Sequence, residues 1–246
     1  MYLAPSGEGQ IYYGAKATFS IYGVPEVKDT QLSSACIWII NGHGSPKRNM
    51  IIVGWTVHPY LYKDNRTHLF TLWTRDGFQT YCYDTRCPGF ILANKTNMVP
   101  GSLIDQVSTY GGPQYDITIK VYKDSASGNW WLYYGASGHY NDLNAIGYWP
   151  SSLFTSLADS ASDIHFGGTV AYLANEQGPP MGSGHYPDEG EGKAATFNRI
   201  QGVYKNGNMY DFQDNFNVVE DKRECYRVSE FKNNGFFYGG PGHCIN

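Results

Sequence analysis

The sequence predicts an all-β protein, an antiparallel β-sandwich with one short helix. Runs of β-branched and aromatic residues of strand length recur along the chain, and turn signals rich in Gly, Asn and Asp separate them. Aromatic residues make up 16% of the 246 residues, as large a share as the charged ones. Such a chain has enough large rings to fill a core between two sheets and too few charges for a disordered protein.

Six segments of the chain have the residue pattern of a β-strand. In residues 12–22, small or polar residues alternate with apolar ones such as Ala17, Phe19 and Ile21, which is typical of a strand with one buried face. Five further runs have the same character: 35–40, 51–57, 69–74, 117–122 and 130–134. Turn signals at 41–44, 76–77, 110–113 and 124–129 fall between them. Residues 150–161 differ, because a proline is followed by apolar residues at helical spacing, which predicts the short amphipathic helix.

Adjacent aromatic residues are the most unusual local feature of the chain. Neighbouring residues in a strand point to opposite faces, so Trp130 and Trp131 cannot both face one core. Most of the rings are expected to pack between the sheets. We expect the remainder to line a groove, where rings stack on sugars or on proline side chains.

Five cysteines divide into two local pairs and one isolated residue. Cys82 with Cys87 and Cys225 with Cys244 lie in turn-rich segments and predict two short-loop disulfides, although four cysteines allow three connectivities. Neither pair has the spacing of a zinc site, so we predict no metal. Cys36 lies in an apolar strand and is expected to be a buried free thiol.

Several function classes are disfavoured by composition and motif. The net charge is −4 and the chain has no Lys/Arg cluster, so nucleic acid is not an expected partner. No apolar run reaches the roughly 18 residues of a membrane span, which argues against a membrane partner. The sequence also has no phosphate-binding loop and no serine nucleophile elbow, and we expect no cofactor. An acidic cluster at 188–191 is expected to be a solvated or cation-binding loop.

Two N-glycosylation sequons begin at Asn65 and Asn94. Together with the paired cysteines they favour an oxidising, secretory compartment, and hence a secreted, extracellular or vacuolar location.

A series of ordered motifs resembles the C-terminal domain of the neprosin family of plant secreted proteins. The motifs span residues 11–246 and include 13–17, 54–59, 61–64, 82–90, 147–150, 181–185 and 238–242. The resemblance implies a β-sandwich with a cleft, made as a precursor behind a pro-domain that this sequence lacks, so residues 1–246 are interpreted as a single neprosin-like domain. It also implies a glutamic peptidase that cleaves after proline in acid.

The resemblance places the two catalytic glutamates at positions that carry other residues here. One glutamate is expected two residues before Gly54-Trp55, where this chain has Ile52, and the other directly after Gly167-Gly168, where it has Thr169. The chemistry needs one ionised and one protonated carboxyl, and neither Ile nor Thr can supply it. Whether the chain is an enzyme is therefore left open.

Two hypotheses follow from these replacements. The first is a secreted pseudo-peptidase that binds a peptide or glycan in an aromatic cleft, in a defence or storage role, and its candidate cleft residues are Trp55, Tyr148, Trp149 and His185. The second is an acid prolyl endopeptidase that uses other acids. The segment 138–144 looks longer than the family norm and is expected to reshape the cleft.

Overall fold

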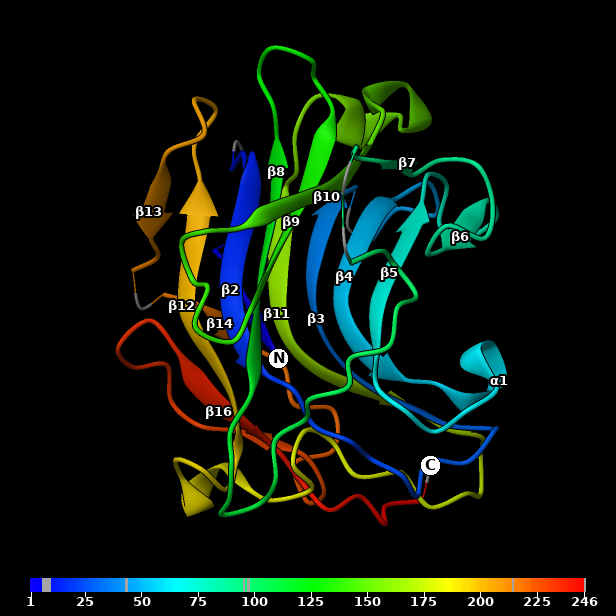
Figure 1. The fold of residues 1–246 in the computed structure, drawn as a ribbon, viewed down its shortest axis with the longest axis vertical. Coiled ribbons are helices and arrows are strands. Elements are labelled where there is room, and N and C mark those ends of the chain that lie inside the picture. The colour runs from blue at the N-terminus through cyan, green and yellow to red at the C-terminus, as the bar shows by residue number, and fades with distance from the viewer. Residues whose placement is uncertain (6–9, 43, 95, 97, 214, 246) are drawn as a thin grey trace.

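The computed structural model describes residues 1–5, 10–42, 44–94, 96, 98–213 and 215–245. Two antiparallel sheets pack face to face in it, as the sequence predicts (Figure 1). The seven-stranded sheet has the order β14-β1-β11-β3-β4-β5-β6. The nine-stranded sheet has the order β15-β16-β12-β2-β8-β9-β10-β7, with β13 also paired to β12.

The strands of the seven-stranded sheet are β1 (Tyr2–Leu3), β3 (Leu32–Asn41), β4 (Asn49–Val57), β5 (His68–Thr74), β6 (Tyr81–Tyr83), β11 (Asp163–Ala171) and β14 (Asn217–Val218). Those of the nine-stranded sheet are β2 (Gly14–Ser20), β7 (Ile91–Leu92), β8 (Asp116–Lys123), β9 (Trp130–Ala136), β10 (Asn144–Trp149), β12 (Ala195–Val203), β13 (Met209–Asp211), β15 (Arg227–Val228) and β16 (Phe236–Gly239). The helical elements are α1 (Pro59–Tyr62) and the 3-10 helices η1 (Ser151–Leu153), η2 (Ser156–Ala158) and η3 (Pro187–Glu189).

The core fills the space between the sheets with large side chains. Alternate residues of β2, β8, β9 and β12 face alternate residues of β3, β4 and β11 there. Trp55 and Trp130 are completely buried, and their indole N–H groups donate to the backbone oxygens of Ser20 and Leu157 at 2.9 and 2.8 Å. When the N–H of a buried Trp has a hydrogen-bond partner, burial of the ring stabilises the fold without the cost of an unsatisfied donor. These tryptophans therefore belong to the packing of the sandwich.

The predicted helix over 150–161 is wrong, and only η1 and η2 form there. The buried Asn49 side chain is the reason. Its Oδ1 accepts the backbone N–H of Thr155 at 2.8 Å and that of Leu157 at 3.2 Å, and its Nδ2 donates to the Thr155 hydroxyl at 2.9 Å. These N–H groups are thus engaged by a distant side chain, and a continuous helix would need them for its own turns. In the part of the chain that the structure describes, the one α-helix is α1, a single turn that begins at Pro59.

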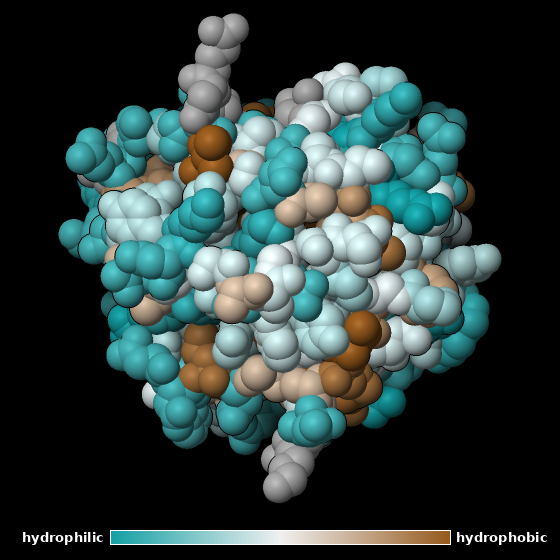
Figure 2. Space-filling model, turned by 90° about the horizontal axis from the view of Figure 1, so that it is seen from above, coloured by the Kyte–Doolittle hydropathy of each residue, from teal (hydrophilic) through white to brown (hydrophobic). Residues whose placement is uncertain are grey.

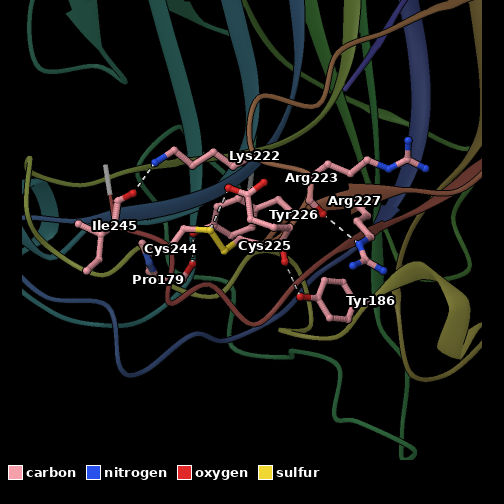
Figure 3. The surroundings of a disulfide bond; sticks show 10 residues. Pro179, Tyr186, Lys222, Arg223, Cys225, Tyr226, Arg227, Cys244 and Ile245 are labelled. Carbon is pink, nitrogen blue, oxygen red and sulfur yellow. Dashed lines mark hydrogen bonds between the residues drawn. A yellow bond between two sulfur atoms is a disulfide. The ribbon is translucent and has the colours of Figure 1, made fainter.

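Both predicted disulfides are confirmed. Cys82 is bonded to Cys87 and Cys225 to Cys244. Figure 3 shows the second bond holding the C-terminal segment, where Lys222 Nζ also donates to the backbone oxygen of Ile245 at 2.7 Å. Cys36 is a buried free cysteine, as expected, and burial raises the pKa of its thiol, so it is not a poised nucleophile.

The surface at one end of the sandwich carries no large apolar patch. Seen from above, apolar side chains occur as separate brown groups between hydrophilic ones (Figure 2). Among the described residues, no helix is long and apolar enough to cross a membrane.

Candidate functional site

Ile52 lies on the outer face of the seven-stranded sheet, in a row of side chains that crosses the sheet. Strand pairing aligns its members side by side: His165 on β11, Trp38 on β3, Ile52 on β4, Leu72 on β5 and Tyr83 on β6. Directly paired residues of antiparallel strands point to the same face. We call these five residues the Ile52 row, and none of them carries a carboxyl group.

Apolar side chains fill the sheet face around this row. Cys36, Trp38, Ile40 and Met50 form a buried cluster separate from the main core, and Met1, Ile52 and Phe70 pack against it. Even Trp38 is only 8% exposed. A carboxylate placed among these mostly buried apolar side chains would be desolvated and its pKa raised.

Thr169 shares this face but not this row. It pairs with Ser34, whereas His165 pairs with Trp38, the neighbour of Ile52. Thr169 is four residues from His165 along β11, roughly 13 Å for an extended strand. The residue of β11 level with Ile52 is therefore His165, so the two positions that the resemblance implies are not opposite one another.

A pocket of about 380 Å³ adjoins Thr169. Residues 168–171 of β11 form one wall and residues 219–222 another, with Tyr226 and Arg227 also at its lining. Among the described strand pairings, β1 aligns with only Phe166 and His165. The edge of β11 beside Thr169 thus borders the pocket and no neighbouring strand.

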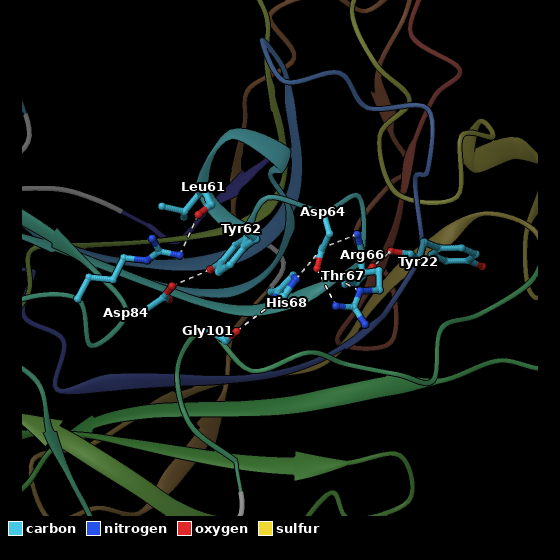
Figure 4. A network of polar contacts seen from close by, with 10 residues as sticks. Tyr22, Leu61, Tyr62, Asp64, Arg66, Thr67, His68, Asp84 and Gly101 are labelled. Atoms are coloured by element: carbon cyan, nitrogen blue, oxygen red, sulfur yellow. Dashed lines mark hydrogen bonds and ion pairs between the residues drawn. The ribbon is translucent and has the colours of Figure 1, made fainter.

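Two carboxyl groups near the seven-stranded sheet, those of Asp64 and Asp84, belong to one network beside α1 (Figure 4). Tyr62 donates to Asp84 Oδ2 at 2.7 Å and stacks on His68 at 4.0 Å, and Asp64 Oδ1 lies 2.9 Å from His68 Nε2. Burial raises the pKa of Asp84, partly offset by a hydrogen bond from the Thr71 backbone. Partial burial opposes ionisation of Asp64 too, but hydrogen bonds from His68 and Arg66 outweigh it and lower its pKa to about 2.

These two carboxyls have opposite pKa shifts, as an acid–base pair requires, but their surroundings are those of a structural network. Asp84 is 2% exposed, and both its oxygens accept hydrogen bonds, one from the Thr71 backbone N–H and one from Tyr62. A carboxyl satisfied and enclosed in this way braces α1 against the sheet.

The four residues predicted to line one aromatic cleft do not meet, which corrects that expectation. Trp55 and Trp149 are both fully buried in the core, so neither can stack on a ligand. Each lies at a strand position whose side chain points into the core. Tyr148 points the opposite way from Trp149, to the outer face of the nine-stranded sheet, and packs on Trp131 with ring centroids 4.7 Å apart.

His185 lies elsewhere again, in the loop beside η3. Its ring stacks on Tyr110 at 3.9 Å, and its Nδ1 is 2.9 Å from Glu189 Oε1. The Tyr110 hydroxyl donates to the other Glu189 oxygen at 2.7 Å. The acidic cluster at 188–191 is thus partly used to tie this loop to its neighbour. Among the described residues, no three His, Cys, Asp or Glu side chains are grouped so that they could hold a metal ion.

The two sequons differ in their surroundings. The Asn65 amide nitrogen donates to the backbone oxygens of Pro25 and Val27, both at 2.8 Å, whereas Asn94 is exposed. A glycan on Asn65 would replace one of the two Nδ2 hydrogens and so break at least one of these hydrogen bonds.

The segment predicted to reshape the cleft covers a different surface. After β9 the chain crosses in front of β2 before it enters β10, and Lys16 Nζ donates to Asn141 Oδ1 at 3.2 Å (Figure 1). The sequence did not place this segment on the outer face of the nine-stranded sheet. The signal that could have done so is that Trp131 and Tyr148 occupy strand positions whose side chains point away from the core.

Comparison with known proteins gives the same fold and a family. Two crystal structures of scytalido-glutamic peptidase are similar to this chain, and each match covers 96% of this chain and 95% of the other. The one with a peptide-based transition-state analog has 8% identity and a TM-score of 0.50, and the one with a transition-state analog inhibitor has 9% and 0.51. The Neprosin family model matches residues 29–241. The resemblance in the motifs is thereby confirmed, and the chain belongs to the neprosin family.

Proposed function

We propose that this neprosin-family domain is a secreted protein that binds an extended peptide and does not cleave it. The observation that carries the proposal is the Ile52 row, in which His165, Trp38 and Ile52 lie level and none supplies a carboxyl. The mechanism that the family resemblance implies needs two carboxyls that share a cleft and differ in pKa. The two disulfides support an oxidising, extracellular compartment.

The edge of β11 suggests how a peptide is held. An extended peptide can add to an exposed strand edge through backbone hydrogen bonds, while a neighbouring pocket accepts its side chains. The edge at 168–171 and the pocket of about 380 Å³ beside it provide both parts. Tyr226 supplies an aromatic surface there, and Arg227 and Glu220 supply opposite charges. The solved relatives with transition-state analogs share the fold, and one of those analogs is peptide-based.

The test is to measure binding and cleavage on one probe. A fluorescent proline-containing peptide should remain intact between pH 2 and pH 6 while its anisotropy rises with protein concentration. Ala171→Trp places a large side chain on the exposed wall of the pocket and should weaken binding at least tenfold. Leu173→Trp, at a position that is 57% exposed, is the matched control and should bind as the parent does.

The alternative function, an acid prolyl endopeptidase, would appear as rapid cleavage after proline, and that result would overturn the proposal. The family match, the peptidase-like fold and the opposite pKa shifts of Asp84 and Asp64 favour it. If cleavage occurs, Asp84→Asn should abolish it. If the peptide stays intact but does not bind, the proposal that the ligand is a peptide would be wrong.

A further inference from the structure

A polar groove lies on the other outer face of the sandwich, that of the nine-stranded sheet. It encloses about 630 Å³, and its lining includes Lys16, Asp116, Asn141, Arg199 and Gln201. A second hollow of about 690 Å³ shares Asp116 with it. The polar groove is separate from the Ile52 row, which belongs to the other sheet.

The walls of the polar groove are held by specific contacts. The Tyr140 hydroxyl donates to Asp116 Oδ2 at 3.4 Å, and the Arg199 guanidinium lies 4.1 Å from the centre of the Tyr140 ring. Arg199 sits where the β12–β2 register shifts and has a φ of 51°, which is unusual for a residue other than glycine. Bulges of this kind redirect a side chain. Here the redirected side chain lines the groove.

Polar atoms inside the groove are left with unmet hydrogen-bonding capacity. Among the described residues, Asp116 Oδ1 is buried without a hydrogen-bond partner, and Lys16, which is 3% exposed, uses one of its three N–H donors on Asn141 Oδ1 at 3.2 Å. Burial lowers the pKa of Lys16, and the nearby charges of Lys120 and Arg199 lower it further. A buried polar atom without a partner is costly, so these atoms favour a ligand that both donates and accepts hydrogen bonds.

An aromatic row continues the same face. Strand pairing places Tyr122, Trp131 and Tyr148 side by side on β8, β9 and β10. All three are partly exposed. The Tyr133 ring centroid lies 6.3 Å from that of Trp131, and Tyr133 is in register with Lys120 and Lys16, on the side of the aromatic row toward the groove. Lys120 lies 4.9 Å above the Tyr122 ring and 5.9 Å above that of Tyr133. Partly exposed rings on a sheet face present apolar surface that a flat ligand can cover.

We propose that the polar groove and the aromatic row together bind a neutral oligosaccharide. A sugar ring has an apolar C–H face, which suits Trp131 and Tyr148, and hydroxyl groups at its edge that both donate and accept, which suits Asp116 and Lys16. The charges that line the groove balance, because Lys16 and Arg199 face Asp116 and Asp211. The balance disfavours a strongly charged ligand, and the remaining polar side chains are largely amides.

The experiment is titration of the whole chain with a panel of neutral oligosaccharides, read by calorimetry and by tryptophan fluorescence. At least one member should bind and shift the fluorescence. Trp131→Ala should weaken its binding at least tenfold, and Asn141→Ala should weaken it by a smaller factor. Tyr60→Ala, which removes a ring that is 69% exposed beside the other sheet, is the control and should leave binding unchanged. Tyr148→Ala repeats the test should Trp131→Ala fail to fold.

Three outcomes would overturn this assignment: no neutral oligosaccharide binds, binding survives loss of Trp131, or only uronate-containing chains bind with a steep salt dependence. Ala171→Trp, the variant that blocks the peptide site, should leave oligosaccharide binding intact. The two proposals can therefore fail independently.

Discussion

The two outer faces of this sandwich differ in chemistry although both are built from antiparallel strands. On the seven-stranded sheet, the Ile52 row and its neighbours form a dry apolar cluster around Trp38. On the nine-stranded sheet, Lys16 and Asp116 line a polar groove beside the aromatic row. The face to which the family resemblance assigns catalysis is therefore the more apolar of the two.

The difference shows how a fold can be kept while its site changes. The core depends only on the inward-facing residues of each strand, and Trp55 and Trp130 satisfy that demand fully. The outward-facing residues do not enter that core. Ile52 packs instead against the separate cluster on the outer face, so the fold does not depend on a carboxyl at this position.

The largest effect is expected at the adjacent tryptophans of β9. Trp130→Ala removes a fully buried ring and a hydrogen bond to Leu157, and it should cost about 3–5 kcal/mol in the free energy of unfolding. Trp131→Ala removes a partly exposed ring of the aromatic row and should cost less than about 1.5 kcal/mol. Chemical denaturation measures both, and equal losses would contradict the assignment of the two rings to opposite faces.

A smaller effect is expected when acids are restored to the seven-stranded face. Ile52→Glu combined with His165→Glu should yield more cleavage of the proline peptide than Ile52→Glu combined with Thr169→Glu, because the first pair lies in one row. Each double variant introduces carboxyls on a largely apolar face and should lose about 1–3 kcal/mol of stability. Peptide cleavage at pH 3 is the measurement. More cleavage from the pair with Thr169→Glu would show that strand curvature brings that position nearer to Ile52.

The smallest effect is a difference in pH dependence between one carboxylate on each face. The lowered pKa of Asp64, about 2, means that it adds stability above the unfolded value of 3.8, and that this stability is lost as the pH falls toward 2. Burial raises the pKa of Asp116, partly offset by the hydrogen bond from Tyr140 to its carboxyl. The stability that it contributes is therefore present below the unfolded value of 3.8 and is lost as the pH rises through its folded pKa.

Melting temperatures across pH 2–7 measure this difference. Asp64→Asn should lower the melting temperature more at pH 6 than at pH 2. For Asp116→Asn, the melting temperature relative to that of the parent should be higher at pH 6 than at pH 3. The parent chain is the reference at each pH. Parallel pH curves for the two variants would contradict the opposite environments of these carboxyls.

Strand phase is what the sequence predicted best. The alternation in residues 12–22 and the adjacent tryptophans at 130 and 131 follow from the two-residue period of a strand, which is local. The spacing of Cys225 and Cys244 likewise predicted their disulfide, because few residues separate them. The predicted helix over 150–161 failed because Asn49, more than a hundred residues away, binds its backbone.

The site was predicted less well, for a similar reason. Trp55, Tyr148, Trp149 and His185 were grouped because they lie in recognisable motifs, but motif membership does not say on which face a side chain lies. Register between strands distant in sequence sets the face and the row, and it makes His165 rather than Thr169 the neighbour of Ile52 across β3. One strand would have to slip by four residues to change that pairing.

The sandwich, the pairing of neighbouring cysteines, the family resemblance and the lack of carboxyls at positions 52 and 169 could be predicted from the sequence. These depend on residue type, on local spacing or on motifs read in order. The three-dimensional structure was needed to show that apolar side chains pack around the Ile52 row, and that a polar groove lined by the buried Lys16 and the half-buried Asp116 lies on the opposite face. Burial and pairing arise between strands far apart in the chain, so no local pattern could specify them.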